Sequence, residues 1–325
     1  MNSLLRLRAF LCRFVTASLF GLVLSAPAEA AGDDIRMVFV GDVMLADTPG
    51  RLVRAGKDPF RHFAGLLQGA DLSIGNLECV ISAKGKAIDK PYTFRAPKRA
   101  LPLLKKYFSA VSLANNHTGD FGKAAFADML TSLDRRGIAF FGGGRNLREA
   151  HQPLVREIKG KRIGLLAYNG FFPRSFEALD DVPGNAWLDE DYVVHDIRHA
   201  KEKLGVDFLI VYPHWGWEYQ KLASARQREM ARLMIDSGAD AVIGGHPHVT
   251  QDIEVYQGKP IFYSLGNFIF DGFNDDDTRT GWALQLTLAA NGALSWTVLE
   301  AKIDRLGVPA RGRTLTPDYF LGPKP

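Results

Sequence analysis

Short apolar runs recur along the chain after residue 33, and a polar or glycine-containing break follows each of them. The runs are rich in Val, Ile and Leu and cover residues 35–40, 70–74, 108–114, 162–168, 207–212 and 239–243. Continuous apolar runs of this length are typical of strands that are covered on both faces. We therefore expect these segments to form sheet in the interior of the domain.

Helical patterns lie between several of these runs. Residues 123–137 and 224–238 place apolar side chains at helical spacing, and each segment ends at a glycine, Gly137 or Gly238. A glycine directly after the last apolar position is a common helix stop. The alternation of strands and helices favours an α/β domain.

The C-terminal third of the chain has a different pattern. Residues 259–271 resemble a strand with a Gly-Asn break, and residues 281–304 alternate apolar and polar side chains around the Asn-Gly pair at 291–292, which is a hairpin signal. We expect a second, more antiparallel set of strands to close one domain over residues 31–306. The Pro- and Arg-containing residues 307–325 predict a loosely ordered tail.

The first thirty residues have the layout of a secretory signal peptide. Three arginines precede an apolar stretch over residues 14–24, and Ala28-Glu29-Ala30 follows as a small-x-small cleavage site. The stretch is short for a membrane span, and an uncleaved anchor is the alternative. We expect an exported chain, periplasmic or extracellular after removal of residues 1–30.

Composition and charge narrow the class of protein. Hydrophobic residues make up 46% and charged residues 23% of the 325 residues, which predicts a packed globular core. The formal charge is +4, and the first thirty residues contribute half of it. The remaining charge is too small to indicate nucleic acid as a partner.

Five of the predicted strands are followed by side chains that bind metals in other proteins. Carboxyl ends of strands in α/β sheets are where ligands bind, because the loops converge there. These candidate ligands are Asp42, Glu78, Asn116, His214, His246 and His248. One ion seldom takes six such side chains and still admits a substrate, whereas two ions about 4 Å apart that share a carboxylate would use them all. Oxygen and nitrogen donors without thiolate suit divalent Zn, Mn or Fe.

The charge balance of such a centre indicates its substrate. Two divalent ions bring four positive charges, of which Asp42 and Glu78 cancel two. The remaining positive field favours an anionic substrate and a metal-bound hydroxide as the nucleophile. The alternative is that the histidines are structural and belong to polar turns.

Four further residues are candidates for catalysis or substrate binding. His117 directly follows Asn116 and is a candidate general acid, with Asp120 placed to orient its ring and keep it protonated. Arg95 lies in a loop and is suited to binding a carboxylate or phosphate. Asn267 interrupts an apolar strand and is expected to point toward the metal centre, as a candidate substrate-binding residue. A helix cap, a surface arginine and a strand bulge are the respective alternatives.

Six blocks of the sequence resemble the CapA-type capsule-synthesis proteins associated with poly-γ-glutamate, a branch of the calcineurin-like metallophosphoesterase superfamily. The blocks are VGDVML (40–45), GNLE (75–78), LANNHTGDFG (113–122), HWGWEY (214–219), GGHPH (244–248) and YSLGNFIFD (263–271). The resemblance implies a two-sheet α/β/β/α sandwich with a metal centre at the strand ends. In it, Asp42 corresponds to the first metal aspartate, and Asn116 and His117 to the metal-binding asparagine and the acid. The three strand-end histidines correspond to the metal histidines.

The chain departs from the metallophosphoesterase pattern in two blocks. Met44 occupies the position of the usual histidine in Asp-x-His, and Gly75-Asn76 replaces the usual Gly-Asp, so that Glu78 is left as the bridging carboxylate. One of the two metal sites is therefore expected to be weaker.

Three functions are compatible with these features. The first is a metal-dependent hydrolase that acts in capsule or exopolymer biogenesis on a phosphorylated or γ-glutamyl substrate. The second is a non-catalytic factor that uses the metal site to bind an anionic polymer during synthesis or export, in an envelope polymer-synthesis complex. The third is a plain binding module with structural histidines.

Overall fold

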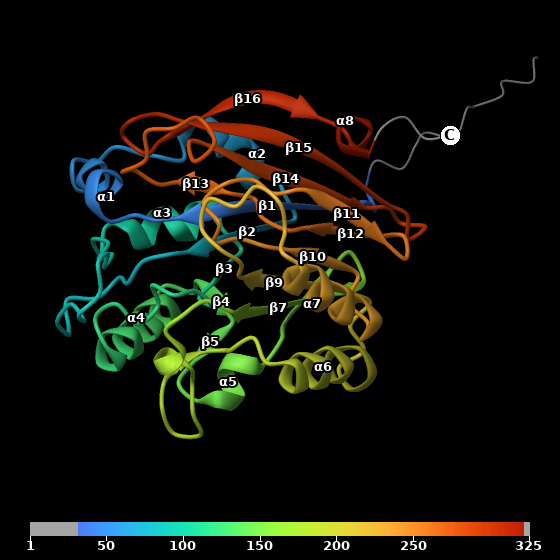
Figure 1. Ribbon diagram of the computed structural model, residues 1–325, viewed down its shortest axis with the longest axis horizontal. Coiled ribbons are helices and arrows are strands. Elements are labelled where there is room, and N and C mark those ends of the chain that lie inside the picture. The colour runs from blue at the N-terminus through green and yellow to red at the C-terminus, as the bar shows by residue number, and fades with distance from the viewer. Residues whose placement is uncertain (1–31, 322–325) are drawn as a thin grey trace, which may run out of the picture. The chain divides into compact units, whose positions relative to one another are not determined.

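The computed structural model describes residues 32–321 of the chain (Figure 1). The segment interpreted as a signal peptide, residues 1–30, lies outside the described residues, as do residues 322–325. Within residues 32–321, none of the helices is both long enough and apolar enough to cross a membrane.

The first sheet has eight strands and combines the start of the chain with its end. Its order is β16-β15-β14-β1-β2-β3-β4, with β13 paired to β1. β1 to β4 are parallel to one another, and β14 to β16 are antiparallel to their neighbours. The strands are β1 (Ile35–Val43), β2 (Leu72–Leu77), β3 (Ala110–Ser112), β4 (Ala139–Phe141), β13 (Asn267–Ile269), β14 (Thr280–Leu288), β15 (Leu294–Ile303) and β16 (Pro309–Leu315).

The second sheet has six strands and comes from the middle of the chain. Its order is β11-β12-β10-β9-β7-β6, and β7, β9, β10 and β12 are parallel. Its strands are β6 (Leu154–Ile158), β7 (Lys161–Asn169), β9 (Phe208–His214), β10 (Ala241–Ile243), β11 (Ile253–Tyr256) and β12 (Lys259–Phe262). A separate two-stranded sheet joins β5 (Gly143–Gly144) to β8 (Gly184–Asn185).

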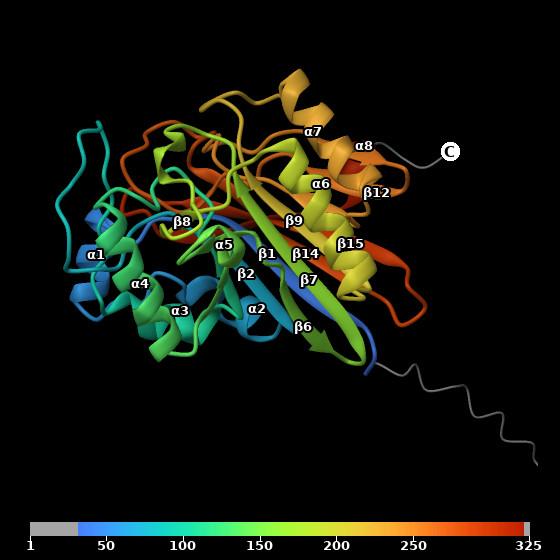
Figure 2. The same ribbon diagram turned by 90° about the horizontal axis from the view of Figure 1, so that it is seen from below.

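Helices cover the outer faces of the two large sheets (Figures 1 and 2). One group packs on the eight-stranded sheet: α1 (Asp47–Arg54), α2 (Ala64–Gln68), α3 (Ala100–Tyr107) and α4 (Lys123–Arg135), with the 3₁₀ helix Arg61–Phe63. The second group packs on the six-stranded sheet: α5 (Leu147–His151), α6 (Glu190–Arg198), the π-helical turn His199–Lys203, and α7 (Ala225–Asp236). Two short helices, the 3₁₀ helix Arg174–Phe176 and α8 (Pro317–Leu321), complete the described chain.

The two sheets pack face to face, which confirms the expected α/β/β/α sandwich. Along β1 the side chains alternate: Met37 and Phe39 enter the core between the sheets, and Val38 and Val40 enter the core beneath the helices. Because both faces of β1 are buried, its sequence is continuously apolar rather than alternating. The same reason explains the other apolar runs from which the sheet was predicted.

Residues 259–271 do not form the single broken strand that we expected. β12 belongs to the six-stranded sheet, while β13 pairs with β1 in the eight-stranded sheet, in parallel and with Asn267 opposite Asp42. The Gly-Asn break is therefore the point at which the chain passes from one sheet to the other. Gly266 has φ +66° there, a conformation that glycine adopts readily.

The expectation of a loosely ordered tail from residue 307 is wrong for the part that the structure describes. β16 is hydrogen-bonded along β15, and Arg313 pairs with the buried carboxylate of Glu300 at 2.8 Å. Phe320 packs against Trp282 and Trp296, with ring centroids 5.2 and 5.8 Å away. An edge strand of polar residues lacks the apolar pattern of a core strand, and for this reason the sequence pattern did not reveal it.

Candidate metal centre

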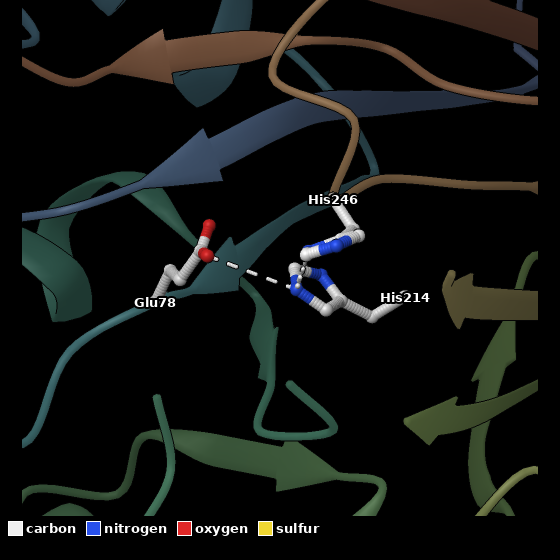
Figure 3. A group of neighbouring side chains, drawn as sticks. All are labelled: Glu78, His214 and His246. Atoms are coloured by element: carbon white, nitrogen blue, oxygen red, sulfur yellow. Dashed lines mark hydrogen bonds and ion pairs between the residues drawn. The ribbon is translucent and has the colours of Figure 1, made fainter. Parts of the chain in front are cut away.

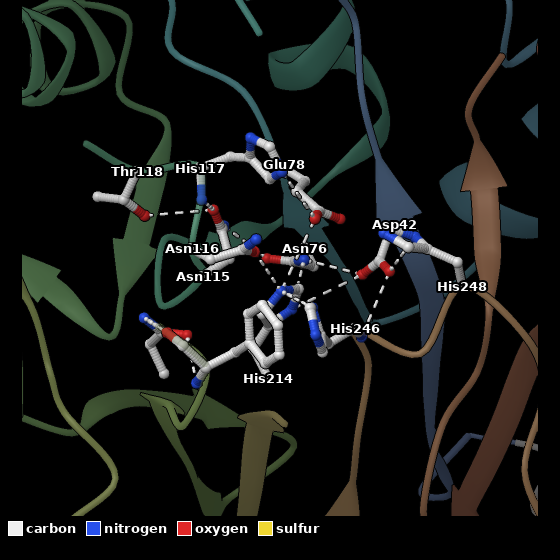
Figure 4. Close-up of polar contacts among 12 residues, drawn as sticks. Asp42, Asn76, Glu78, Asn115, Asn116, His117, Thr118, His214, His246 and His248 are labelled. Atoms are coloured by element: carbon white, nitrogen blue, oxygen red, sulfur yellow. Dashed lines mark hydrogen bonds and ion pairs between the residues drawn. The ribbon is translucent and has the colours of Figure 1, made fainter. Parts of the chain in front are cut away.

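The six predicted ligands converge at one edge of the sandwich, although they come from both sheets (Figure 4). They lie at the carboxyl ends of β1, β2 and β9 or in the loops that follow β3 and β10. All six side chains are buried: Asp42, Glu78, His214 and His246 at 0% exposure, His248 at 4% and Asn116 at 7%. So many buried polar groups in one place require partners.

The carboxylate of Glu78 is buried without a hydrogen bond from residues 32–321, and the dashed line that joins it to His214 in Figure 3 marks an ion-pair distance. Neither of its oxygens has a hydrogen bond among the described residues. Its Oε1 lies 3.7 Å from Nε2 of His214 and 3.9 Å from Nε2 of His117. Burial raises the pKa of Glu78 well above its usual value, and the neighbouring carboxylate of Asp42 raises it further. A carboxylate held in this way would be stabilised by a cation.

The imidazoles of His214 and His246 complete a first group of donors with Glu78. Nε2 of His214 lies 2.9 Å from Oδ1 of Asn116 and 3.1 Å from Nδ1 of His246. Nε2 of His246 is buried without a partner. One ligand atom from each of Glu78, His214 and His246 lies within 4.8 Å of the other two.

Asp42 and His248 form a second group with the same Glu78, again within 4.8 Å of one another. Asp42 accepts a hydrogen bond of 2.8 Å from the side-chain amide of Asn76 and one of 3.3 Å from the backbone N–H of His246. Its Oδ2 lies 3.5 Å from Nδ1 of His248. Glu78 therefore belongs to both groups, and its carboxylate would be shared if each group held an ion.

The residues present fit divalent metal ions. Orphaned buried donors remain on Glu78 and His246, and the surrounding set consists of imidazole nitrogen and carboxylate or amide oxygen. These donors suit Zn²⁺, Mn²⁺ or Fe²⁺. The structure thus brings together every residue that the sequence suggested as a metal ligand.

Steric crowding explains the two glycines of the segment GGHPH (244–248) beside this site. A Cβ on Gly244 would lie 2.1 Å from the carbonyl oxygen of Tyr263, and one on Gly245 would lie 3.0 Å from Oδ1 of Asp42. His246 and His248 themselves have φ angles of +97° and +58°. Such angles are unusual for residues with side chains and concentrate at functional sites.

His117 occupies the position expected of a proton-transferring group, but in a different charge state. Its Nδ1 lies 2.7 Å from Oδ2 of Asp120, as expected, and its Nε2 faces Glu78. Burial lowers the pKa of His117 to about 4, although Asp120 opposes this shift. The ring is therefore neutral at pH 7 in the ion-free protein, and the expectation that Asp120 keeps it protonated is wrong for this state.

Comparison with known proteins identifies the family. Residues 36–272 match the description "Bacterial capsule synthesis protein PGA_cap", and this segment contains all six candidate ligands. The chain belongs to the PGA_cap family.

Curated relatives in this family carry related names. The chain is 33% identical over 267 residues to "PGA biosynthesis protein CapA" of Bacillus subtilis, which covers 80% of this chain and 69% of the relative. It is 32% identical over 248 residues to "Capsule biosynthesis protein CapA" of Bacillus anthracis, covering 74% of this chain and 60% of the relative. The chain thus spans less than two thirds of the B. anthracis protein. The "Probable polyglutamine synthesis accessory protein" of Mycobacterium tuberculosis is 29% identical over 265 residues, covering 76% of this chain and 70% of the relative.

Among solved structures, the NAD nucleotidase of Haemophilus influenzae matches 86% of this chain and 54% of its own, with 12% identity and a TM-score of 0.46. A sulfate thiohydrolase, SoxB, matches 77% of this chain and 42% of its own, with 12% identity and a TM-score of 0.43.

In this PGA_cap chain, Met44 has no place among the ligands. It is fully buried, and its sulfur accepts a hydrogen bond of 3.1 Å from the backbone N–H of Ala46. Asn76, which stands where an aspartate was expected, donates to Asp42 instead of offering a carboxylate. Neither residue therefore offers a donor to an ion at this centre.

The two residues predicted to bind substrate have other contacts. The guanidinium of Arg95 lies over the ring of Phe121 at 3.8 Å and donates to the backbone carbonyls of Lys84 and Gly85. Arg95 therefore fixes its own loop. Asn267 is fully buried and points toward the centre, where its Oδ1 lies 2.9 Å from Nδ1 of the candidate ligand His248.

Three polar residues of the centre were missed in the sequence. Lys90 donates to Oδ1 of Asp120 at 2.7 Å and to the backbone carbonyl of Asn116 at 2.9 Å. Asn115 donates to Oδ1 of Asn76 at 2.9 Å. Asn115 and Asn76 lie inside the conspicuous blocks and were within reach of sequence reasoning. Lys90 lies in an irregular loop, and no local pattern distinguishes it.

Proposed function

We propose that this chain acts in the biogenesis of an anionic capsule polymer of the poly-γ-glutamate type and is a metal-dependent hydrolase. Membership of the PGA_cap family and the names of its relatives support the polymer context. The proposal also places the protein outside the cytoplasm, because residues 1–30 have the layout of a signal peptide.

One observation carries the hydrolase assignment. The carboxylate of Glu78 is buried without a hydrogen bond between two groups of metal-type donors. A fold does not retain such an arrangement for stability, because an unpaired buried carboxylate is destabilising by several kcal/mol. Divalent ions held there would supply positive charge and Lewis acidity for hydrolysis of a phosphoryl or acyl centre.

The residues of the chain have separate roles in this proposal. Asp42, Glu78 and the three histidines hold the ions and set the positive field that attracts an anionic substrate. His117 exchanges a proton with the substrate at Nε2, and Asp120 fixes its ring through Nδ1. Lys90 neutralises the buried charge of Asp120. Asn115 positions the backbone of His117, whose N–H donates to Oδ1 of Asn115 at 3.0 Å.

A second function is favoured by one specific observation. Burial lowers the pKa of the His117 ring to about 4, and a neutral ring whose Nδ1–H donates to Asp120 has no proton on Nε2, the nitrogen that would face a leaving group. A centre that only binds the carboxylates of a polymer would need no proton donor. In this alternative the protein handles the polymer without cutting it, within a polymer-synthesis complex.

Purified mature protein and the His117→Ala variant decide between these functions. Each is loaded with Zn²⁺ or Mn²⁺ and assayed on phosphomonoester, phosphodiester and γ-glutamyl substrates. The hydrolase proposal requires turnover by the wild type and a loss of at least about hundredfold in the variant. Equal turnover by both proteins removes His117 from the reaction, and no turnover by either, with retained polymer binding, supports the alternative. Failure of the wild type to bind any divalent ion refutes both.

A further inference from the structure

Glu218 lies at the edge of the metal centre and belongs to neither of the two donor groups that contain Glu78. It follows β9 in the segment His214–Tyr219 and is half-buried. A carboxylate oxygen of Glu218 and one ring nitrogen from each of His246 and His248 all lie within 4.8 Å of one another. Both histidines also belong to the donor groups that contain Glu78.

Backbone hydrogen bonds place Glu218 beside these histidines. The N–H of Gly245 donates to the carbonyl of Pro213 at 3.0 Å, and the N–H of Trp215 donates back to the carbonyl of Gly245 at 3.1 Å. One residue beyond Glu218, the N–H of Tyr219 donates to the carbonyl of Pro247 at 2.8 Å. These bonds join the two loops in a fixed register on both sides of Glu218, so that its proximity to the histidines does not depend on a free loop.

The two donor groups that Glu218 adjoins through His246 and His248 differ in how many donors they offer. The first group has the nitrogen donors of His214 and His246 together with Asn116 and the shared Glu78. Among residues 32–321, the second group consists of Asp42, His248 and the shared Glu78, and the sulfur of Met44 accepts from a backbone N–H. Three ligands leave a divalent ion with fewer protein donors than a closed site provides.

We propose that Glu218 is a ligand of the ion held by Asp42 and His248, and that it compensates for the donor lost at Met44. The inference rests on the metal centre of the proposed function and extends it. With Glu218, this half of the centre offers three carboxylates and one imidazole, and the other half remains richer in nitrogen. Carboxylate oxygen suits Mn²⁺, and imidazole suits Zn²⁺ and Fe²⁺. The centre is therefore built for two unlike ions.

The charge of Glu218 also changes the field of the loaded centre. Asp42, Glu78 and Glu218 cancel three of the four charges that two divalent ions bring. One net positive charge remains, which attracts an anionic group weakly enough to release it. Because Glu218 is half-buried and its neighbours Trp217 and Tyr219 are exposed, the ion on this side lies nearer to solvent.

Metal titration of three full-length proteins tests the proposal: the wild type, Glu218→Gln, and Glu229→Gln as the matched control. Glu229 lies on α7, is exposed and pairs only with Arg226 in the part of the chain described. After chelation and dialysis, Mn²⁺ binding is followed by electron paramagnetic resonance and Zn²⁺ binding by calorimetry. The wild type and Glu229→Gln should bind one ion of each kind. Glu218→Gln should lose at least about tenfold in Mn²⁺ affinity and keep its Zn²⁺ affinity within about twofold.

The retained Zn²⁺ affinity shows that the variant is folded, and Glu218→Asp provides a second check. The shorter carboxylate should bind Mn²⁺ with an affinity between those of the wild type and Glu218→Gln. Wild-type Mn²⁺ affinity in Glu218→Gln refutes the role of Glu218 and leaves the proposed centre intact. A wild type that binds neither ion refutes the centre itself, so that the two failures are distinct.

Discussion

Oδ1 of Asn267 lies 2.9 Å from Nδ1 of His248, and the orientation of this amide is determined by its other contacts. Nδ2 of Asn267 donates to the backbone carbonyls of His248 and Thr278 at 3.2 and 3.0 Å. Because both partners are acceptors, Oδ1 must face the ring, and Nδ1 of His248 must carry the proton. Nε2 then has the free lone pair that a metal ion requires.

Replacing Asn267 should weaken metal binding without removing any ligand. Asn267→Ala takes away the acceptor that fixes the tautomer of His248, and we expect metal affinity to fall about 10- to 100-fold, measured by calorimetry. Asn267→Asp keeps an acceptor at the ring but places a carboxylate against two carbonyls. Asn267→Asp should bind metal more tightly than Asn267→Ala does. It should also unfold at a lower denaturant concentration than the wild type. Equal affinities in the two variants would contradict the orienting role.

Glu78→Gln should make the ion-free protein more stable and at the same time abolish metal binding. The substitution preserves shape and removes a carboxyl group that burial and Asp42 make costly to ionise, and we expect the ion-free protein to gain about 2 kcal/mol in free energy of unfolding at a pH where this group is ionised. Metal should no longer stabilise this variant, whereas the wild type should gain about 2.7 kcal/mol at an ion concentration one hundred times the dissociation constant. Urea denaturation with chelator and with Zn²⁺ measures both effects. A destabilised ion-free variant would show that Glu78 has a structural partner.

Gly281 in β14 is predicted to be irreplaceable because of the strand beside it. A Cβ there would lie 1.6 Å from the backbone oxygen of Asn267. Gly281→Ala should therefore displace β13, lower the free energy of unfolding by about 2 kcal/mol or more, and weaken metal binding through His248. Gly65 in α2 is the control, since a Cβ at that position meets nothing within 4 Å. Gly65→Ala should be neutral or slightly stabilising in the same denaturation experiment.

The contact between Glu300 and Arg313 should make the attachment of β16 dependent on pH. Hydrogen bonds from Arg313 lower the pKa of Glu300 below its usual value of 4.5. A carboxyl group with a lowered pKa stabilises the fold above its unfolded-state pKa, and this stabilisation is lost as the pH falls through its folded-state pKa. At pH 7, Glu300→Gln should unfold at lower urea than the wild type. The difference should shrink as the pH is lowered from 5 to 3, and an unchanged difference would contradict the assignment.

The sequence predicted that the candidate metal ligands lie together, because strand ends are a strong spatial signal. Asp42 and Glu78 follow apolar runs typical of buried parallel strands, and parallel strands bring their carboxyl ends to one edge. The ligands from β9 and from the loop after β10 meet them only because the second sheet packs on the first. That packing was supplied by the family resemblance and not by the strand pattern.

Other features depend on contacts that local patterns do not encode. The passage of the chain between sheets at residues 263–266 follows from strand pairing over long distances, and the attachment of β16 follows from Glu300 and from the aromatic side chains around Phe320. The neutral state of His117 depends on burial, which the adjacent Asp120 alone does not reveal. The residue types indicated the chemistry of the site. The charge of His117 and the orientation of the His248 ring depend on their three-dimensional surroundings.

Because the chain passes from one sheet to the other between β12 and β13, the protein cannot be cut into two fragments that each keep the site. Asn267 belongs to β13 of the eight-stranded sheet. His248, whose ring it orients, lies in the loop after β10 of the six-stranded sheet. A sliding of one layer against the other would break the contact that orients the imidazole. A fragment that contains only one of the two sheets therefore cannot reproduce the site. Metal binding at this centre depends on the packing of the two sheets against each other.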